Sequence, residues 1–297
     1  MDIVLTGVTK RYRRGALALD RLDLTVPGGM YGLLGANGAG KTTLMRLLVG
    51  LLQPTAGTVR VGDHDLATRA GRRAVRRVLG YLPQEAGVYP DLTAREFLDY
   101  IALLKGIDRT ADRRRQVGAM LEVVGLADKA GDKLRTFSGG MRRRIGIAQA
   151  LVADPRLLIV DEPTAGLDPQ ERVRFRTLLA RLAGDRTVLL STHIVSDVAQ
   201  TARQVGVLGA GRLLFAGSVQ ELTQRAHGRV WTVTTGAEPP AGATVVSALP
   251  DGAGTRYRIV SAQAPAGGAV AAEPTLEDGY LALTAGTAPA DPATPRS

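Results

Sequence analysis

The residues best suited to chemistry are the eight from Gly35 to Thr42, GANGAGKT, which fit the pattern G-x-x-x-x-G-K-[ST]. We expect Gly35, Gly38 and Gly40 to adopt positive φ angles, with which successive backbone N–H groups turn inward as a cradle for phosphate oxygens. The simpler interpretation is a glycine-rich turn that happens to precede a lysine. The segments on either side of the loop distinguish these two interpretations.

An apolar run at 31–34 precedes the loop, and an apolar-periodic segment at 44–48 follows it, so the order is strand, loop, helix. The helix N-terminus adds its partial positive charge to the cradle. Lys41 would reach the β- and γ-phosphates, and the Thr42 hydroxyl would bind Mg²⁺. Together these features predict a nucleoside triphosphate site.

Two adjacent carboxylates, Asp161 and Glu162, end the fully apolar run at 157–160, which is typical of a strand buried in a parallel sheet. Carboxylates at a buried strand end are costly without a cationic or hydrogen-bonding partner. Mg²⁺ beside the phosphates would be that partner for Asp161. Glu162 would then face the position of an attacking water.

Two more predicted strands end in polar side chains, the strand at 78–82 near Gln84 and the strand at 187–190 near His193. Each residue alone has an ordinary interpretation, a surface amide for Gln84 and a structural histidine for His193. Because ligands gather at the carboxyl ends of strands in open α/β sheets, we expect both residues to join Asp161 and Glu162 at one sheet edge.

The stretch from about 91 to 150 has helical periodicity and forms a predicted insertion between strands. Near its end, Ser138-Gly139-Gly140 precedes a helix and offers a hydroxyl, bare amides and a helix dipole to a phosphate. Alone this is weak evidence, because many helices begin with Ser and Gly. Tyr12, between predicted strands at 2–8 and 22–26, is equally consistent with a core aromatic and with a flat platform for a base.

The composition is that of a globular chain: 297 residues, 45% of them hydrophobic, with no cysteine. Disulfides and thiolate metal sites are therefore excluded, and a reducing compartment is permitted. The N-terminus has charges where a signal peptide needs its apolar core, and no apolar run approaches the roughly 20 residues that span a bilayer. We expect a soluble or peripheral protein.

The formal net charge is +10, and arginines cluster at 72–77, at 113–115 and at 142–144. Such clusters can attract nucleic acid, anionic lipid or an acidic partner. Solvated helix faces are the favoured interpretation of the first two clusters. No aromatic residues are interleaved with the arginines, which weakens a nucleic-acid interpretation.

The remaining pattern predicts a hairpin from 205–208 and 213–215, and helices at about 169–183 and 218–225. Beyond His227 the composition shifts to Gly, Ala, Pro, Val and Thr, with alternating stretches at 230–234, 244–246 and 257–260. We therefore expect a first domain at 1–226, a small β-rich accessory domain at 227–283, and a disordered Ala/Pro/Thr-rich tail at 284–297.

With these motifs in order over about 2–225, the chain resembles the nucleotide-binding subunit of an ATP-binding-cassette (ABC) transporter. Gly35 to Thr42 resembles the Walker A loop, 157–162 the Walker B strand, and Ser138-Gly139-Gly140 the signature. The signature is the specific element, since many P-loop enzymes share the Walker motifs. It departs from the usual pattern at Phe137 and Met141, but its Ser and Gly are intact.

The same resemblance makes Tyr12 the adenine-stacking aromatic, Gln84 the Q-loop glutamine, 166–168 the D-loop and His193 the switch histidine. It implies a P-loop NTPase of the α/β class, with a mixed sheet core, an N-terminal antiparallel β-subdomain, the helical insertion and the C-terminal β-rich appendix. The nucleotide contacts implied are those of Tyr12, Gly35, Asn37, Gly38, Ala39, Gly40, Lys41, Thr42, Thr43, Ser138, Gly139, Gly140 and Asp168. The implied metal ligands of Mg²⁺ are Thr42, Gln84 and Asp161.

The resemblance also implies a mechanism, in which ATP binds between Walker A of one cassette and the signature of another, so that the chain acts as a homodimer or beside a similar cassette. Glu162, His193, Lys41 and Gln84 would be catalytic. A polytopic membrane permease would be the second partner, with the chain peripheral on the cytoplasmic face of the cell membrane and no direct nucleic-acid contact.

Weaker patterns at 81–96 and at 274–280, PTLEDGY, resemble exporter ATPases of the daunorubicin-resistance type. A rival function is a soluble ABC-type ATPase acting on nucleic acid or ribosomes. Such proteins usually show two cassettes, a long coiled coil or zinc-binding cysteines, which this sequence lacks. A P-loop kinase or GTPase would not explain the signature, and the guanine-reading N-K-x-D string is absent.

Overall fold

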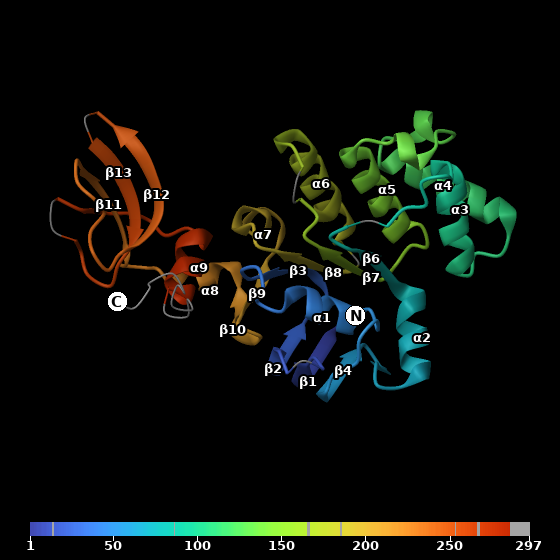
Figure 1. Cartoon of the computed structure of the whole chain (residues 1–297), viewed down its shortest axis with the longest axis horizontal. Coiled ribbons are helices and arrows are strands. Elements are labelled where there is room, and N and C mark those ends of the chain that lie inside the picture. The colour runs from blue at the N-terminus through green and yellow to red at the C-terminus, as the bar shows by residue number, and fades with distance from the viewer. Residues whose placement is uncertain are drawn as a thin grey trace.

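The computed structural model describes residues 1–13, 15–85, 87–164, 167–184, 186–252, 254–265 and 268–285. Three sheets and the helices around them make up this part of the chain (Figure 1). The predicted α/β class, with a mixed sheet, an antiparallel N-terminal sheet, a helical insertion and a C-terminal β-rich region, is confirmed.

The central sheet has the strand order β10-β9-β3-β8-β7-β6. Five of these strands run parallel and β10 pairs antiparallel with β9, as the predicted hairpin requires. β7 and β8 are buried along their whole length, which explains the apolar runs at 157–160 and 188–190 within them. The strands are β3 (Gly29–Leu34), β6 (Leu79–Leu82), β7 (Leu157–Asp161), β8 (Thr187–Thr192), β9 (Gln204–Gly209) and β10 (Arg212–Ser218).

The second sheet is antiparallel and has the order β2-β1-β4-β5. Its strands alternate buried apolar with exposed polar residues, so that one face packs on helix α1 (Lys41–Leu48) and the central sheet. The strands are β1 (Ile3–Arg11), β2 (Leu17–Val26), β4 (Ala56–Val61) and β5 (His64–Asp65).

The insertion between β6 and β7 is helical, as predicted. Its residues Phe97, Leu121 and Ile145 belong to an apolar core that the insertion shares with one face of the central sheet, where Leu158 and Leu190 lie. The insertion holds α3 (Ala94–Leu104), α4 (Thr110–Val123), the short 3-10 helices η1 (Ala127–Lys129) and η2 (Leu134–Thr136), and α5 (Gly139–Leu151). In Figure 1, α3 and α4 lie at one end of the molecule. The other helices before the C-terminal sheet are α2 (Arg69–Val78), α6 (Pro169–Leu182), α7 (Val195–Thr201) and α8 (Val219–Gln224).

The third sheet, β12-β13-β11-β14, lies at the opposite end of the molecule from α3 and α4 (Figure 1). Helix α9 (Leu276–Thr284) follows it and returns to the first part of the chain, where Leu276 shares an apolar core with Val198 of α7 and Leu222 of α8. A Cβ at Gly279 would lie 2.1 Å from the carbonyl oxygen of Leu222, so only glycine permits this approach of α9 to α8. The strands are β11 (Val230–Thr235), β12 (Thr244–Asp251), β13 (Gly254–Val260) and β14 (Val270–Ala271).

The end of α9 corrects one boundary expected from the sequence. Thr284 belongs to the last turn of α9, where its hydroxyl donates to the carbonyl of Tyr280 at 2.9 Å, and does not begin a tail. The rest of the expected tail, 286–297, lies outside the described residues.

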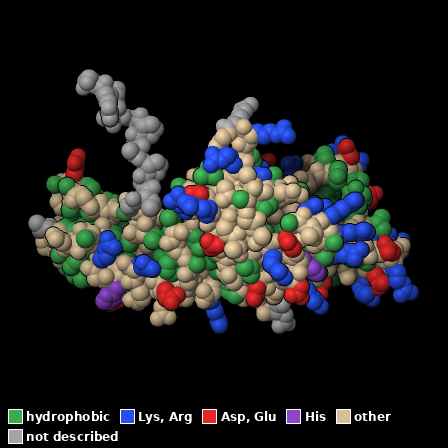
Figure 2. All heavy atoms as spheres, turned by 90° about the horizontal axis from the view of Figure 1, so that it is seen from below, with side chains coloured by type: hydrophobic (Ala, Val, Ile, Leu, Met, Phe, Trp, Pro, Cys, Tyr) green, Lys and Arg blue, Asp and Glu red, His purple; other side chains and the backbone are tan. Residues whose placement is uncertain are grey.

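The arginine clusters differ in their surroundings. The first two lie on α2 and α4, mostly exposed, and Figure 2 shows Lys and Arg side chains interspersed with Asp and Glu over the face it presents. In the third cluster Arg142 is exposed but Arg143 is buried. The solvated-face interpretation thus holds for most arginines of the first two clusters. It fails for Arg113, whose side chain is 11% exposed and bonded to Asp99, and for Arg143. In the part of the chain that the structure describes, no helix combines the length and the apolar character needed to cross a bilayer.

Candidate nucleotide site

Four parallel strands end at one edge of the central sheet, and the loops that follow them meet there, as the sequence predicts. The loop after β3 leads into α1, and Gln84, Glu162 and His193 follow β6, β7 and β8. A cavity of about 260 Å³ opens between these loops. It is lined by Ala18, Ala36, Asn37, Gly38, Gly40, Lys41, Thr42, Thr43, Gln84, Glu162 and His193.

The glycines of the loop act in two ways. Gly38 and Gly40 have φ angles of 82° and 104°, as expected for a phosphate cradle. Gly35 does not have a positive φ, so the expectation for this residue is wrong. Glycine is required at position 35 for a steric reason, because a Cβ there would lie 2.6 Å from the carbonyl oxygen of Leu208. Ala39 is buried behind the loop.

Helix α1 begins at Lys41 with Gly40 as its N-cap, and no side chain caps it. Its first N–H groups therefore remain available to an anion in the cavity. The Lys41 ammonium donates to the carbonyls of Gly35 at 2.6 Å and Ala36 at 3.3 Å.

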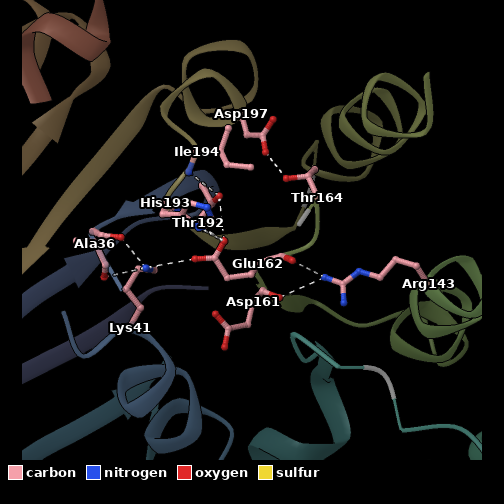
Figure 3. A network of polar contacts seen from close by, with 11 residues as sticks. Ala36, Lys41, Arg143, Asp161, Glu162, Thr164, Thr192, His193, Ile194 and Asp197 are labelled. Atoms are coloured by element: carbon pink, nitrogen blue, oxygen red, sulfur yellow. Dashed lines mark hydrogen bonds and ion pairs between the residues drawn. The ribbon is translucent and has the colours of Figure 1, made fainter. Parts of the chain in front are cut away.

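Lys41, Glu162 and His193 form one chain of polar contacts (Figure 3). Lys41 Nζ lies 3.2 Å from Glu162 Oε1, and His193 Nδ1 lies 2.8 Å from Glu162 Oε2. The Thr192 hydroxyl donates to the same Oε2 at 3.4 Å. The carboxylate of Glu162 thus lies between a cation of the phosphate loop and the imidazole at the end of β8.

Glu162 takes up a left-handed backbone conformation, with φ 47°, which is uncommon for a residue with a side chain. Its N–H donates to the Ser191 carbonyl at 2.8 Å, so the chain leaves β7 while still bonded to β8. This turn brings the Glu162 carboxylate into the cavity at the point where β7 ends. Such strained conformations persist where surrounding contacts hold them, and they concentrate at functional sites.

Asp161, at the end of β7, is 1% exposed, and neither carboxylate oxygen has a hydrogen-bond partner in the described structure. Burial raises the pKa of Asp161, while the nearby Ser191 hydroxyl lowers it and the charge of Glu162 raises it further. A buried carboxylate in this state favours a bound cation.

Two oxygen donors at this strand end suit a hard cation. Asp161 provides a carboxylate and the nearby Thr42 a hydroxyl, and Gln84, which has an amide oxygen, lines the cavity together with Thr42. Mg²⁺ prefers one or two protein carboxylates together with phosphate and water. No cluster of three or more His, Cys, Asp or Glu side chains suited to a metal occurs among the described residues. The residues present therefore fit Mg²⁺ bound with a nucleotide better than a metal held by the protein alone.

Tyr12, whose role the sequence leaves open, is not a core residue. It is 38% exposed, and its hydroxyl lies 3.2 Å from Thr43 Oγ1 at the cavity. Lys10 Nζ lies 5.7 Å from the centre of its ring. The ring is thus exposed beside the phosphate loop, and the core interpretation of Tyr12 is wrong.

Seven predicted nucleotide contacts are not among the residues that line this cavity. Three of them, Tyr12, Gly35 and Ala39, lie in or beside the phosphate loop, and the other four are Ser138, Gly139, Gly140 and Asp168. Ser138 is exposed and caps α5, where its hydroxyl accepts from the N–H of Met141 at 3.2 Å. Asp168 is also exposed and caps α6 by accepting from the N–H of Glu171 at 2.8 Å. Gly166 of the predicted D-loop lies outside the described residues.

Two sets of contacts near the site were not expected from the sequence. Asp197 of α7 is fully buried and accepts a hydrogen bond from the Thr164 hydroxyl, while Arg176 lies 3.4 Å away. Arg143 of α5 is also buried, under the loops that end β6 and β7. Arg143 lies four and seven residues before the buried Ile147 and Ala150, and this helical periodicity could have indicated from the sequence that Arg143 is buried.

Comparison with known proteins agrees with this geometry. The family model described as "ABC transporter" matches residues 19–165. The uncharacterised ABC transporter ATP-binding protein YxlF of Bacillus subtilis is 40% identical over 203 residues, which cover 68% of this chain and 66% of that protein. The daunorubicin resistance ATP-binding protein DrrA3 of Streptomyces coeruleorubidus is 40% identical over 76% of this chain and 71% of its own length. The chain thus spans about two thirds of the length of these relatives.

The solved structures include the ATP-binding cassette MJ0796 as a dimer in a post-hydrolysis state with ADP and Pi. It shares 26% identity with this chain, with a TM-score of 0.68, over 73% of this chain and 98% of that one. The fold described above agrees with these relationships. The chain belongs to the ABC transporter family, as an ATP-binding protein that carries the family's ATPase cassette.

Proposed function

We propose that this chain is the ATP-hydrolysing subunit of an ABC transporter, and that it drives transport by a separate membrane-spanning subunit. The observation that carries the proposal is the contact chain Lys41, Glu162, His193 at the mouth of the phosphate loop. It places a phosphate-binding cation, a carboxylate and an imidazole around one cavity. Phosphoryl transfer to water needs these groups for positioning and charge stabilisation.

Within this site we assign a role to each side chain. Lys41 and the N–H groups of Gly38 and Gly40 bind the phosphates, with Asn37, Ala39, Thr42 and Thr43 completing the loop. Glu162 orients the attacking water and accepts its proton, and His193 holds the γ-phosphate. Mg²⁺, bound by Thr42, Asp161 and Gln84, would neutralise charge on the phosphate oxygens. Tyr12 stacks on the adenine.

The signature residues act on a second nucleotide. Ser138 and Gly139 are exposed and outside their own chain's cavity, at the start of a helix whose N-terminus favours anions. We propose that Ser138, Gly139 and Gly140 bind the γ-phosphate held by a second copy or a similar cassette, with Asp168 at the same interface. The dimeric form of the MJ0796 cassette, a protein of this fold, supports this assignment.

We propose more specifically that the transport is export, because the chain is 40% identical to a daunorubicin resistance ATP-binding protein. The chain would act at the cytoplasmic face of the membrane through its permease partner. We also propose that 227–283 is an accessory domain on a cassette formed by 1–226, since the third sheet shares no strand with the other two in the described structure. The alternative, an ATPase acting on nucleic acid, has no support from the relatives named above.

The test is phosphate release by the purified full-length chain, alone and with the membrane protein that co-purifies with it. We expect turnover that requires Mg²⁺ and a polytopic partner that raises it. Absence of turnover in both preparations would remove ATP hydrolysis from the proposal, and nuclease-sensitive association with nucleic acid would favour the rival function.

A further inference from the structure

Arg143 is buried in α5, with 9% of its surface exposed, and all five of its guanidinium N–H donors have acceptors in backbone carbonyls. NH1 donates to Pro83 at 2.9 Å and Gln84 at 2.6 Å, in the loop after β6. Nε donates to Pro163 at 2.9 Å. NH2 donates to Glu162 at 2.8 Å and Asp161 at 3.3 Å.

These contacts fix the backbone of the loop that carries Glu162. Glu162 has φ 47°, and in this conformation its carbonyl bonds to Arg143 while its carboxylate meets Lys41 and His193 (Figure 3). An unfavourable backbone conformation needs such contacts to persist. The guanidinium therefore holds the conformation in which Glu162 faces the cavity.

A planar fork of donors is essential to this arrangement. Burial lowers the pKa of Arg143 to about 10, so the group remains a cation at neutral pH, and Asp161 and Glu162 favour that charge. A lysine has three donors on one nitrogen, so it cannot replace the five N–H donors that Arg143 spreads over three nitrogens and the carbonyls of two loops. A lysine at position 143 would keep the charge but lose the geometry.

Arg143 also belongs to the helix that begins with the signature. Ser138 caps α5, and Arg143 lies little more than one helical turn further along the same helix. Helix α5 thus connects the signature residues, which are proposed to bind the nucleotide of a second cassette, with the backbone of Gln84 and Glu162 in this chain's own site.

We infer that Arg143 is a positioning residue, which fixes the orientation of the Glu162 carboxylate and links Glu162 to helix α5. Binding of a second cassette against Ser138 would then align the catalytic carboxylate of this chain. The inference rests on the proposed function. It goes beyond that function in assigning the coupling between two sites to one buried guanidinium.

The experiment compares Arg143→Lys and Arg143→Met with the wild-type full chain. It measures ATP turnover, affinity for a fluorescent ATP analogue, and thermal unfolding. Arg72→Met is the matched control, because Arg72 also donates to two carbonyls, those of Leu66 at 2.8 Å and Ala67 at 2.6 Å, but on α2. ATP-dependent dimerisation is followed by size-exclusion chromatography with the same Arg143 variants in a Glu162→Gln background.

We expect both Arg143 variants to lower kcat about tenfold or more, as misplacement of a catalytic group does. Analogue affinity should change less than about threefold, because the phosphate loop is untouched. Arg72→Met should keep wild-type kcat, and the double variants should still dimerise with ATP.

Three results would overturn the inference: folded variants with wild-type kcat, equal losses of kcat and affinity, or loss of ATP-dependent dimerisation. If Arg143→Met fails to fold, Arg143→Lys decides. If neither folds while Arg72→Met does, Arg143 serves stability and the inference is wrong. A wild-type chain without turnover would instead contradict the proposed function.

Discussion

The ammonium of Lys41 and the carboxylate of Glu162 form an ion pair, with 3.2 Å between Nζ and Oε1, and both side chains are almost completely buried. Lys41 also donates hydrogen bonds to the carbonyls of Gly35 and Ala36, whereas its contact with Glu162 is an ion pair in which Oε1 accepts no hydrogen bond from the described residues. A nucleotide phosphate that attracts Lys41 must draw it from Glu162. We therefore expect phosphate binding to free one carboxylate oxygen for the attacking water.

Glu162→Gln should leave ATP binding intact and lower turnover by about 10²- to 10⁴-fold, the range for loss of a general base. Glutamine keeps the shape of the side chain but cannot accept the proton. The measurement pairs phosphate release with binding of a fluorescent ATP analogue, and size-exclusion chromatography should show a dimer trapped with ATP. Turnover at the wild-type rate would remove Glu162 from this role.

Tyr12→Ala should weaken ATP affinity about tenfold and leave kcat within about twofold, because stacking on a base contributes about 1–3 kcal/mol and does not touch the reacting atoms. Tyr12→Phe is the control, since it keeps the ring and loses only the 3.2 Å contact with Thr43. Affinities come from titration with ATP. Equal affinities for wild type and Tyr12→Ala would mean that the exposed ring does not stack on the base.

Asp161→Asn should stabilise the nucleotide-free chain while abolishing Mg²⁺-dependent turnover. Burial raises the pKa of Asp161 above its value in the unfolded chain, so ionisation costs stability as pH rises through the folded-state pKa. At pH 7 we expect the variant to melt about 2 °C or more above wild type. The gain should shrink as pH falls towards about 4, the range of an unperturbed carboxyl. A lower melting temperature at pH 7 would contradict this account.

Asp278→Asn should destabilise the C-terminal region. Asp278 is fully buried and accepts two hydrogen bonds from Arg258, at 3.0 and 2.6 Å. Burial alone would raise the pKa of Asp278, but the bonds from Arg258 and Thr275 lower it overall. Loss of a buried pair of this kind costs about 3 kcal/mol.

The fluorescence of Trp231, the only tryptophan of the chain, reports on this region from β11. Because the pKa is lowered, the contribution of Asp278 is present above about pH 3.9 and is lost as pH falls through the folded-state value. The Trp231 transition of wild type should therefore move to lower temperature in acid, while that of Asp278→Asn changes less. Identical Trp231 transitions at pH 7 would show that the pair is not stabilising.

The sequence allowed the strands and the phosphate loop to be predicted because their signals are local, as in the apolar run of β7 and the glycine spacing of the loop. The strand-end residues were predicted from one general rule, that parallel strands end at one edge. The burial of Arg143 was not predicted, because its acceptors lie in loops far away in the sequence, at Pro83 and Glu162. The left-handed conformation of Glu162 has no local signal at all.

Helix α9 has a practical consequence for any attempt to shorten the protein. The chain leaves the cassette after α8 and comes back to it through α9, whose Leu276 is buried against Val198 and Leu222. The β11–β14 sheet is therefore anchored at two points. Truncation after residue 226 would therefore remove α9 as well as the sheet. The apolar surface of α7, the helix that follows His193, would then lose its contact with Leu276 and become exposed to water.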